Sequence, residues 1–343
     1  MTALTTNIFI IHSPLQHLLV SHMVSEMTEF RERDNYLVLD MPSDQITLKK
    51  EIWTDIVYLD PPVGRYFIGS GANCRRSIRY IEELKSPFEN AALFVSDIEW
   101  PLNNAVYGLK QKHRDKNILI CNFPDGAGSL MVRYPRFKRK IRSLIKFLIG
   151  MAGGLPYTFY SGDIMGLEAC DRVYSLMPKL LPDDINSNMI EIPKFRIEEE
   201  NFLPDSCLFL GQTYEYHFPP EEHREFCTKT ADYIKSLGYR HNYYKPHFFA
   251  KTETEKNIFL ERGFELIEDS RPVEEIFLSR QMSCIASYNS SALVHLKLMF
   301  GDKIRSISCF NNWSNKYTIT GKTSFESARR LFEACGVEMF EQD

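Results

Sequence analysis

The chain has 343 residues, of which 44% are hydrophobic and 25% are charged, the balance of a soluble globular protein. This length exceeds one ordinary domain and suits two. The formal net charge of −4 argues against general nucleic-acid binding.

Short apolar segments alternate with amphipathic segments in the first half of the chain. Strands are predicted at residues 7–13, 35–41, 55–60, 91–97, 117–123 and 170–178. Helices are predicted at residues 14–29, 74–86 and 101–113. Strands that alternate with helices predict a parallel sheet with helices on both of its faces.

The segment 133–150 differs in charge from the rest of the chain. Its seven basic residues are Arg133, Arg136, Lys138, Arg139, Lys140, Arg142 and Lys146, and it contains no acidic residue. Apolar residues follow at Leu144, Ile145, Phe147, Leu148 and Ile149. Two interpretations fit: peripheral contact with the anionic lipid of an inner membrane, or a solvated helix face whose apolar side joins the core.

The alternation stops at residues 178–205, where prolines, an acidic run and weak periodicity predict a linker. It then resumes, with strands predicted at residues 207–212, 241–247, 264–269, 282–288 and 303–309. Helices are predicted at residues 220–238, 272–280, 292–301 and 323–336, and a surface loop at 249–257. We therefore predict two doubly wound α/β domains, 1–198 with the linker and 199–343, with the ligand in the cleft between them at the carboxyl ends of the strands.

Eight cysteines are scattered without a CxxC pair, which favours reduced, mostly buried thiols over a disulfide framework or a zinc site. The N-terminal run NIFII is interrupted by His12 and Pro14, so no signal peptide is expected. No segment reaches the roughly 18 apolar residues of a membrane span. These features predict a cytoplasmic protein without a metal site.

Several short motifs at predicted strand ends have both a structural and a functional interpretation. In NSS, Ser290 and Ser291 begin a helix, where serine caps the backbone and where hydroxyls and free N–H groups also bind phosphate. In PDG, Asp125 either forms a turn or acts as a general base. In KPH, proline holds the preceding lysine extended, and His247 projects from a turn just past a strand. Glu274 opens a helix, either for dipole reasons or to accept from ribose hydroxyls.

Six motifs occur in a definite order along nearly the whole chain. They are SPLQ after the first strand, the acidic-glycine motif, the strand LFLGQ, KPH, a P-x-E helix start and the paired-serine helix start. This ordered set resembles the bacterial sialyltransferases of GT-B fold, in particular the lipooligosaccharide sialyltransferases of glycosyltransferase family 52 and the capsular polysialyltransferases. The resemblance implies two Rossmann-like domains, the N-terminal one for the acceptor and the C-terminal one for a CMP-sugar donor.

The resemblance also implies roles for individual residues. Asp125 would deprotonate the acceptor hydroxyl, and His247 would protonate or hydrogen-bond the departing phosphate of CMP. The implied donor-binding residues are Ser290, Ser291, Glu274, Lys245 and Gly211. The implied candidates for the acceptor cleft are His12, Gln16, Asp97 and Asn103. The reaction would be an inverting transfer of sialic acid from CMP-Neu5Ac, without cofactor or metal, to an oligosaccharide or lipid-linked glycan ending in galactose.

Two departures from the family pattern leave alternatives open. The first acid of the family's acidic motif, commonly the base, is here Pro124, so Asp125 or another acid such as Asp97 would serve. Phe248 stands where the family has proline. The alternatives are transfer of another CMP-activated nonulosonic acid, such as Kdo or pseudaminic acid, polymerisation, or an inactive nucleotide-sugar-binding protein. Homodimerisation stays open.

Overall fold

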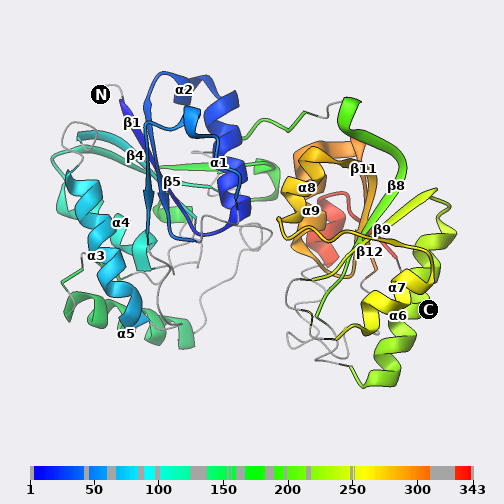
Figure 1. The fold of residues 1–343 in the computed structure, drawn as a ribbon. Helices are drawn as coiled ribbons and strands as arrows, with labels where there is room; N and C mark the ends of the chain where they lie inside the picture. Colours follow the sequence, from blue (N-terminus) through cyan, green and yellow to red (C-terminus); the bar gives the residue numbers. More distant parts are fainter. Residues whose placement is uncertain are drawn as a thin grey trace. The chain divides into compact units, whose positions relative to one another are not determined.

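The computed structural model describes residues 4–41, 46–59, 67–83, 89–96, 101–123, 137–152, 154–155, 157–159, 167–181, 189–196, 199–213, 218–247, 250, 252–309 and 329–340. It divides into two compact units, Met1–Pro193 and Lys194–Asp343, whereas the sequence analysis placed the division after residue 198. Figure 1 shows the two units, and each is described by itself.

The N-terminal unit contains a seven-stranded parallel sheet with the order β3-β2-β1-β4-β5-β6-β7. Its strands are β1 Thr6–Ile11, β2 Asp34–Leu39, β3 Asp55–Tyr58, β4 Asn90–Val95, β5 Asn117–Asn122, β6 Arg172–Ser175 and β7 Met189–Glu191. Its α-helices are α1 Pro14–Glu26, α2 Thr28–Arg31, α3 Phe67–Glu83, α4 Pro101–Lys112 and α5 Phe137–Ala152. The strand order reverses between β1 and β4, which makes this position the switch point of a doubly wound sheet.

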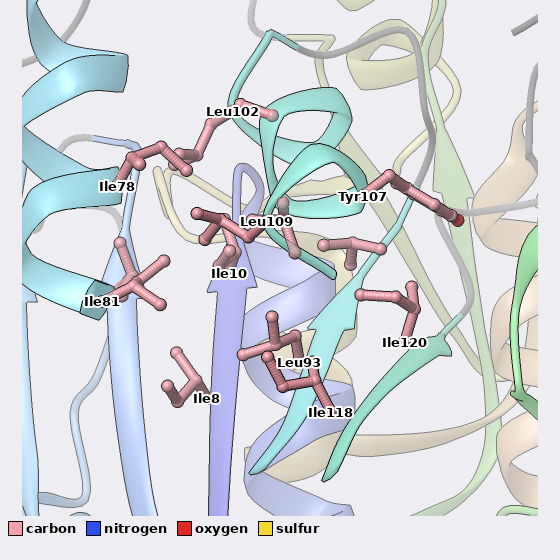
Figure 2. Close-up of a cluster of buried hydrophobic side chains, with 14 of the residues drawn as sticks. Ile8, Ile10, Ile78, Ile81, Leu93, Leu102, Tyr107, Leu109, Ile118 and Ile120 are labelled. Atoms are coloured by element: carbon pink, nitrogen blue, oxygen red, sulfur yellow. The ribbon is translucent and has the colours of Figure 1, made fainter. Parts of the chain in front are cut away.

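Helices cover both faces of this sheet because successive strand residues point to opposite sides. Ile8 and Ile10 of β1 belong to the cluster that α3 and α4 complete, as Figure 2 shows with Leu109 of α4. Phe9, between them, instead stacks on Phe94, and its ring centre lies 5.8 Å from that of Phe30 in α2. Burial on two sides explains why the central strands read as continuous apolar runs.

The C-terminal unit contains a six-stranded parallel sheet with the order β10-β9-β8-β11-β12-β13. Its strands are β8 Phe202–Leu210, β9 His241–Lys245, β10 Glu265–Leu266, β11 Gln281–Ser287, β12 Arg305–Ser308 and β13 Glu338–Met339. Its α-helices are α6 Pro220–Ser236, α7 Thr254–Glu261, α8 Val273–Ser279 and α9 Ser291–Phe300. The switch point of this sheet lies between β8 and β11.

The core of the C-terminal unit is rich in aromatic side chains. Phe209 of β8 stacks on Phe259 of α7 with ring centres 4.4 Å apart, and Phe226 of α6 stacks on Tyr288 at 4.7 Å. These rings place α6 and α7 on one face of the sheet. Helices α8 and α9 pack against each other, and α9 also contacts β11 and β12.

The structure corrects two predictions and bears out a third. The predicted linker 178–205 contains β7, which pairs with β6, and the first residues of β8. The predicted loop 249–257 contains the beginning of α7. All eight cysteines are buried and free, as expected. None of the described helices is long and apolar enough to cross a membrane.

Candidate functional site

The first group of predicted site residues lies at the switch point of the N-terminal sheet. His12 follows the last residue of β1, and Asn103 lies in the first turn of α4, the helix after β4. The Nε2 atom of His12 lies 2.9 Å from Oδ1 of Asn103. The backbone N–H of His12 donates to Oε1 of Gln16 at 2.7 Å. The structure therefore brings together three of the four acceptor-cleft candidates.

Asp40 completes this group, and the sequence analysis did not find it. The Nδ1 atom of His12 lies 3.0 Å from Oδ2 of Asp40, which follows β2. Strands β1 and β2 are adjacent, with Ile11 opposite Leu39, so the residues after them meet at the same edge. The signal in the sequence was a polar residue directly after each of two apolar strands.

Acceptor atoms flank both nitrogens of the His12 ring. An aspartate oxygen lies beside Nδ1 and an amide oxygen lies beside Nε2, so the ring is held between two polar partners. The side chain of Asn103 in turn donates from Nδ2 to Oγ of Ser96 at 3.3 Å. The His12 side chain is only 2% exposed, whereas that of Asp40 keeps 14%. Asp40 is therefore the member of this pair that a ligand can reach.

Two acids that the sequence analysis proposed as bases cannot be placed. Asp97 and Asp125 lie outside the described residues, as does Pro124. The strands that precede them, β4 and β5, end at Val95 and Asn122, which are paired with each other. Their assignment as catalytic residues stays a prediction.

The second group lies at the carboxyl edge of the C-terminal sheet. Leu210 of β8 is in register with Lys245 of β9 and with Ser287 of β11. The Ser287 hydroxyl donates to the Leu210 carbonyl at 2.8 Å. The residues that follow these three strand ends include Gly211, His247 and the paired serines. Ligands of doubly wound sheets bind at this edge, and here the edge includes the switch point.

Ser290 is the N-cap of α9, as one of the two interpretations predicted. Its Oγ accepts from the backbone N–H of Ala292 at 3.3 Å. Ser291, the first residue of the helix, is exposed. The first turn of α9 contains no acidic residue, whereas that of α8 contains Glu274 and Glu275. The exposed hydroxyl of Ser291, the positive end of the helix dipole and the absence of negative charge make this helix start suitable for an anion.

Glu274 is buried and has a partner on the neighbouring helix. Its Oε1 lies 3.1 Å from Nδ1 of His295, and the two side chains are about one-tenth exposed. The Nε2 atom of His295 is buried and has no hydrogen-bond partner among the described residues. The sequence analysis did not find the contact between His295 and Glu274.

Lys245 and His247 lie at the carboxyl end of β9, on the same edge of the sheet. The Lys245 ammonium donates to the backbone carbonyl of Asp269, which ties the end of β9 to the loop before α8. Burial lowers the pKa of Lys245, the nearby Asp269 carboxylate opposes this change, and Arg271 adds to it. His247 is half-buried two residues past the strand, and its backbone carbonyl accepts from the N–H of Ala250 at 2.9 Å.

Gly211 lies against a buried polar cluster. A Cβ atom at this position would lie 2.4 Å from Oε1 of Glu255 and 2.7 Å from the hydroxyl oxygen of Tyr244. Tyr244 donates to Glu255 at 3.0 Å. Glycine is therefore required here by the close approach of buried side chains, in addition to any role in donor binding.

Glu255 belongs to a set of metal-ligand residue types that the sequence analysis did not foresee. His223 and Cys227 lie one turn apart in α6, and the ligand atoms of these three residues lie within 4.8 Å of one another. His223 Nε2 lies 3.4 Å from Cys227 Sγ, to which Tyr288 donates at 3.7 Å. These contacts supply partners within the cluster, and we assign it no ion.

A hollow of about 410 Å³ lies in the N-terminal unit, but it does not coincide with the predicted site. Its lining residues include Lys110, Gln111 and Arg114 near the end of α4, together with Thr158 and Phe159. None of the predicted site residues lines it. Ligands of doubly wound sheets bind at the carboxyl ends of the strands, so these edges remain the predicted site.

Comparisons with known proteins support the same assignment of fold. Residues 164–309 match the alpha-2,8-polysialyltransferase (POLYST) family. No curated protein matches the chain significantly in sequence. Among solved structures, the alpha/beta-galactoside alpha-2,3-sialyltransferase of the luminous marine bacterium Photobacterium phosphoreum is similar, with a TM-score of 0.57, 9% identity and 98% of each chain covered.

Other similar structures have different activities. The UDP-GlcNAc 2-epimerase of Methanocaldococcus jannaschii has a TM-score of 0.54 and 9% identity, with 96% of this chain and 92% of that chain covered. The glycosyltransferase SnogD of Streptomyces nogalater has a TM-score of 0.51 and 10% identity, with 99% and 87% covered. The shared fold therefore does not select the reaction. The chain has the GT-B fold and, with its match over residues 164–309, resembles the bacterial GT-B sialyltransferases, as its sequence motifs indicated.

Proposed function

We propose that this protein is an inverting sialyltransferase, which moves sialic acid from CMP-Neu5Ac to a terminal sugar of a bacterial surface glycan. Galactose is the expected acceptor sugar, at the end of a lipopolysaccharide or capsule chain. The family match over residues 164–309 carries this proposal, because it spans every donor-binding residue that the motifs indicate. The location of this chemistry would be the cytoplasm, at the inner membrane.

The C-terminal unit would hold the donor. The start of α9 would bind the phosphate of CMP through the positive end of its helix dipole and the hydroxyl of Ser291. Glu274 would accept from the ribose hydroxyls. His247 would donate a proton or a hydrogen bond to the phosphate as the bond to sialic acid breaks, which stabilises the charge that develops there.

The N-terminal unit would hold the acceptor. Asp125 would take the proton of the attacking hydroxyl, and Asp97 is the alternative from the sequence. The pair of His12 and Asp40 would position acceptor hydroxyls at the end of β1, since the Asp40 carboxylate is the more exposed of the two. Attack on the side opposite the CMP leaving group inverts the configuration at the reacting carbon.

Paired variants test the donor site. His241 is the exposed first residue of β9, and His247 lies two residues past the last residue of that strand. We expect His247→Asn to reduce turnover of CMP-Neu5Ac by roughly a hundredfold or more, and His241→Asn to leave it unchanged. Ser291→Ala should raise the KM for the donor, whereas Ser236→Ala at the end of α6 should not. Equal effects within either pair would contradict the assignment.

A second candidate function follows from Pro124. Because proline occupies the position of the usual base, the chain could bind a nucleotide sugar without transferring it. Asp125→Asn distinguishes the two functions. An enzyme would lose turnover with little change in donor affinity, whereas a binding protein would show no turnover before or after the change. If CMP-Neu5Ac fails and CMP-Kdo or CMP-pseudaminic acid is turned over, the donor assignment changes and the fold assignment stays.

Metal independence is also part of the proposal. CMP leaves as a stable phosphate monoester, so the helix dipole at the start of α9, Ser291 and His247 would suffice to stabilise it. Turnover should persist in EDTA, and elemental analysis of the purified protein should find no stoichiometric zinc in the cluster around Glu255. Loss of turnover in EDTA, restored by a divalent cation, would contradict this part.

A further inference from the structure

Helix α5 presents a row of large apolar side chains to solvent. Ile141, Leu144, Ile145, Leu148 and Met151 are between 45% and 57% exposed. They recur every three or four residues, so they lie along one face of the helix. These five residues are called the apolar face below. Only two other large hydrophobic residues among those described are comparably exposed, Tyr58 and Phe159. A contiguous exposed patch of this kind marks an interaction site.

The other side of α5 is fixed to the N-terminal unit. Phe147 packs against the hydrophobic core, and its ring meets that of Phe159 edge-on with centres 6.1 Å apart. A Cβ atom on Gly150 would lie 2.8 Å from the side chain of Tyr157, so the helix approaches this buried tyrosine closely. Helix α5 also contacts α3, beside which it lies at the lower edge of the unit in Figure 1. Helix α5 therefore packs on the N-terminal unit through the side that carries Phe147 and Gly150, and the apolar face points away from the unit into solvent.

This arrangement counts against one of the two interpretations of segment 133–150. The solvated-helix interpretation required the apolar residues to join the core, and among those described only Phe147 does so. Leu144, Ile145 and Leu148 are instead about half exposed. Because these side chains are exposed, the interpretation that places them in the core is wrong for these residues. A row of apolar side chains exposed to water is costly in free energy unless a partner covers it.

Charge identifies the occupant of the apolar face. Helix α5 carries five basic residues, Lys138, Arg139, Lys140, Arg142 and Lys146, and no acidic one, although the chain as a whole has a net charge of −4. Lys140, one residue before the apolar face begins, is exposed. A surface that combines exposed apolar side chains with concentrated positive charge fits anionic headgroups above an acyl-chain boundary.

Other occupants fit less well. Two copies of the chain that met through this face would bring two positively charged segments together, since symmetric contacts pair the same surface. A soluble anionic polymer would match the charge but would leave the apolar face in water. A lipid surface satisfies both properties at once.

We propose that α5 docks the protein on anionic membrane surfaces, with the apolar face inserted at the level of the headgroups and acyl chains. The helix has 16 residues and basic positions throughout its first ten, so it would lie in the plane of the interface. Docking would bring the N-terminal unit, which we assign to the acceptor, next to lipid-linked glycans. The docking itself does not depend on sialyltransferase activity.

Vesicle binding by the full chain tests this inference. The probes are vesicles of phosphatidylcholine alone and vesicles of equal parts phosphatidylcholine and phosphatidylglycerol, floated on a density gradient at low and high salt. We expect binding to the anionic vesicles only, weakened by salt. The variant Leu144→Gln, Leu148→Gln should reduce binding at least about tenfold, and Lys140→Glu should weaken it further.

Tyr58→Gln is the matched control, because Tyr58 is also half exposed but lies on the edge strand β3. It should bind vesicles like the unchanged protein, and all variants should keep the same unfolding midpoint because the altered side chains are exposed. No vesicle binding by the unchanged chain overturns the inference. Binding that the leucine variant leaves intact also overturns it, because the apolar face would then be unused. A dimer in gel filtration that the leucine variant converts to a monomer would instead assign the face to a second copy and overturn docking on lipid.

Discussion

Replacing Gly211 by alanine would force a methyl group into the buried space between β8 and α7. The new Cβ atom would lie 2.4 Å from Oε1 of Glu255 and 2.7 Å from the hydroxyl oxygen of Tyr244. The tyrosine ring cannot retreat freely, because it stacks on Phe259 with ring centres 4.9 Å apart. To restore ordinary van der Waals contact, the two oxygens must move by roughly 1 Å. Such movement strains the hydrogen bond that joins them at 3.0 Å.

Overpacking of a buried site costs about 1–3 kcal/mol, and a hydrogen bond to a charged group contributes about 1.5–3 kcal/mol. We therefore expect Gly211→Ala to lower the free energy of unfolding of the C-terminal unit by about 2–4 kcal/mol. This value combines overpacking with partial loss of the hydrogen bond between Tyr244 and Glu255. Urea unfolding monitored by circular dichroism measures the change. CMP affinity should fall as well, since Gly211 lies at the donor edge.

A second variant separates the contact from any general effect of alanine. Tyr244→Phe removes the hydroxyl oxygen that the new methyl group would meet. The cost of Gly211→Ala should therefore be smaller in the Tyr244→Phe background, which a double-mutant cycle measures. A cost below about 0.5 kcal/mol, or the same cost in both backgrounds, would refute the reasoning.

Three further predictions concern polar side chains. Glu274→Gln should weaken CMP binding by roughly 10- to 100-fold in calorimetric titration. His295→Ala should also weaken CMP binding, and His295→Asn should weaken it less. Unchanged affinity for CMP would contradict the assignment of Glu274 to the ribose. Burial lowers the pKa of His17 to about 4, and the charge of Lys49 adds to this. In the unfolded chain the pKa of His17 is near 6.5, so between about pH 6.5 and pH 4 the unfolded state binds more protons than the folded state. The free energy of unfolding therefore has its full value above about pH 6.5 and falls towards about pH 4, by up to about 1.4 kcal/mol per pH unit. His17→Asn should reduce that slope in urea unfolding at several pH values, and an equal slope would contradict it. Asp40→Asn should lower both the melting temperature and the turnover, because it weakens the contact with His12. No effect on either quantity would contradict the role of Asp40 in positioning the acceptor.

Strand and helix positions followed from the sequence where burial imposed a clear periodicity. The central strands are buried on both faces, so each appears as an apolar run bounded by polar residues. β7 was missed because it is a three-residue edge strand, too short for a pattern to develop. α7 was missed because its buried apolar residues are few, although Gly263, with a φ of 76°, marks the end of a helix there.

The site followed from the sequence only in part. Residues that follow a strand within a few positions, such as His247 and Ser290, could be located because they lie at the carboxyl edge of a parallel sheet. Contacts between elements far apart in the chain could not. Asp40 and His12 are 28 residues apart, and Glu274 and His295 are 21 apart, so no local spacing indicated either pair.

Incubation of the purified chain with CMP-Neu5Ac and lactose in the presence of EDTA tests the central claim most directly. CMP release and the sugar product are followed together by chromatography. We predict CMP release matched by an equal amount of sialylated lactose, with loss of both in the His247→Asn variant. No CMP release and no sialylated product, in a chain that still binds CMP, would contradict the sialyltransferase assignment.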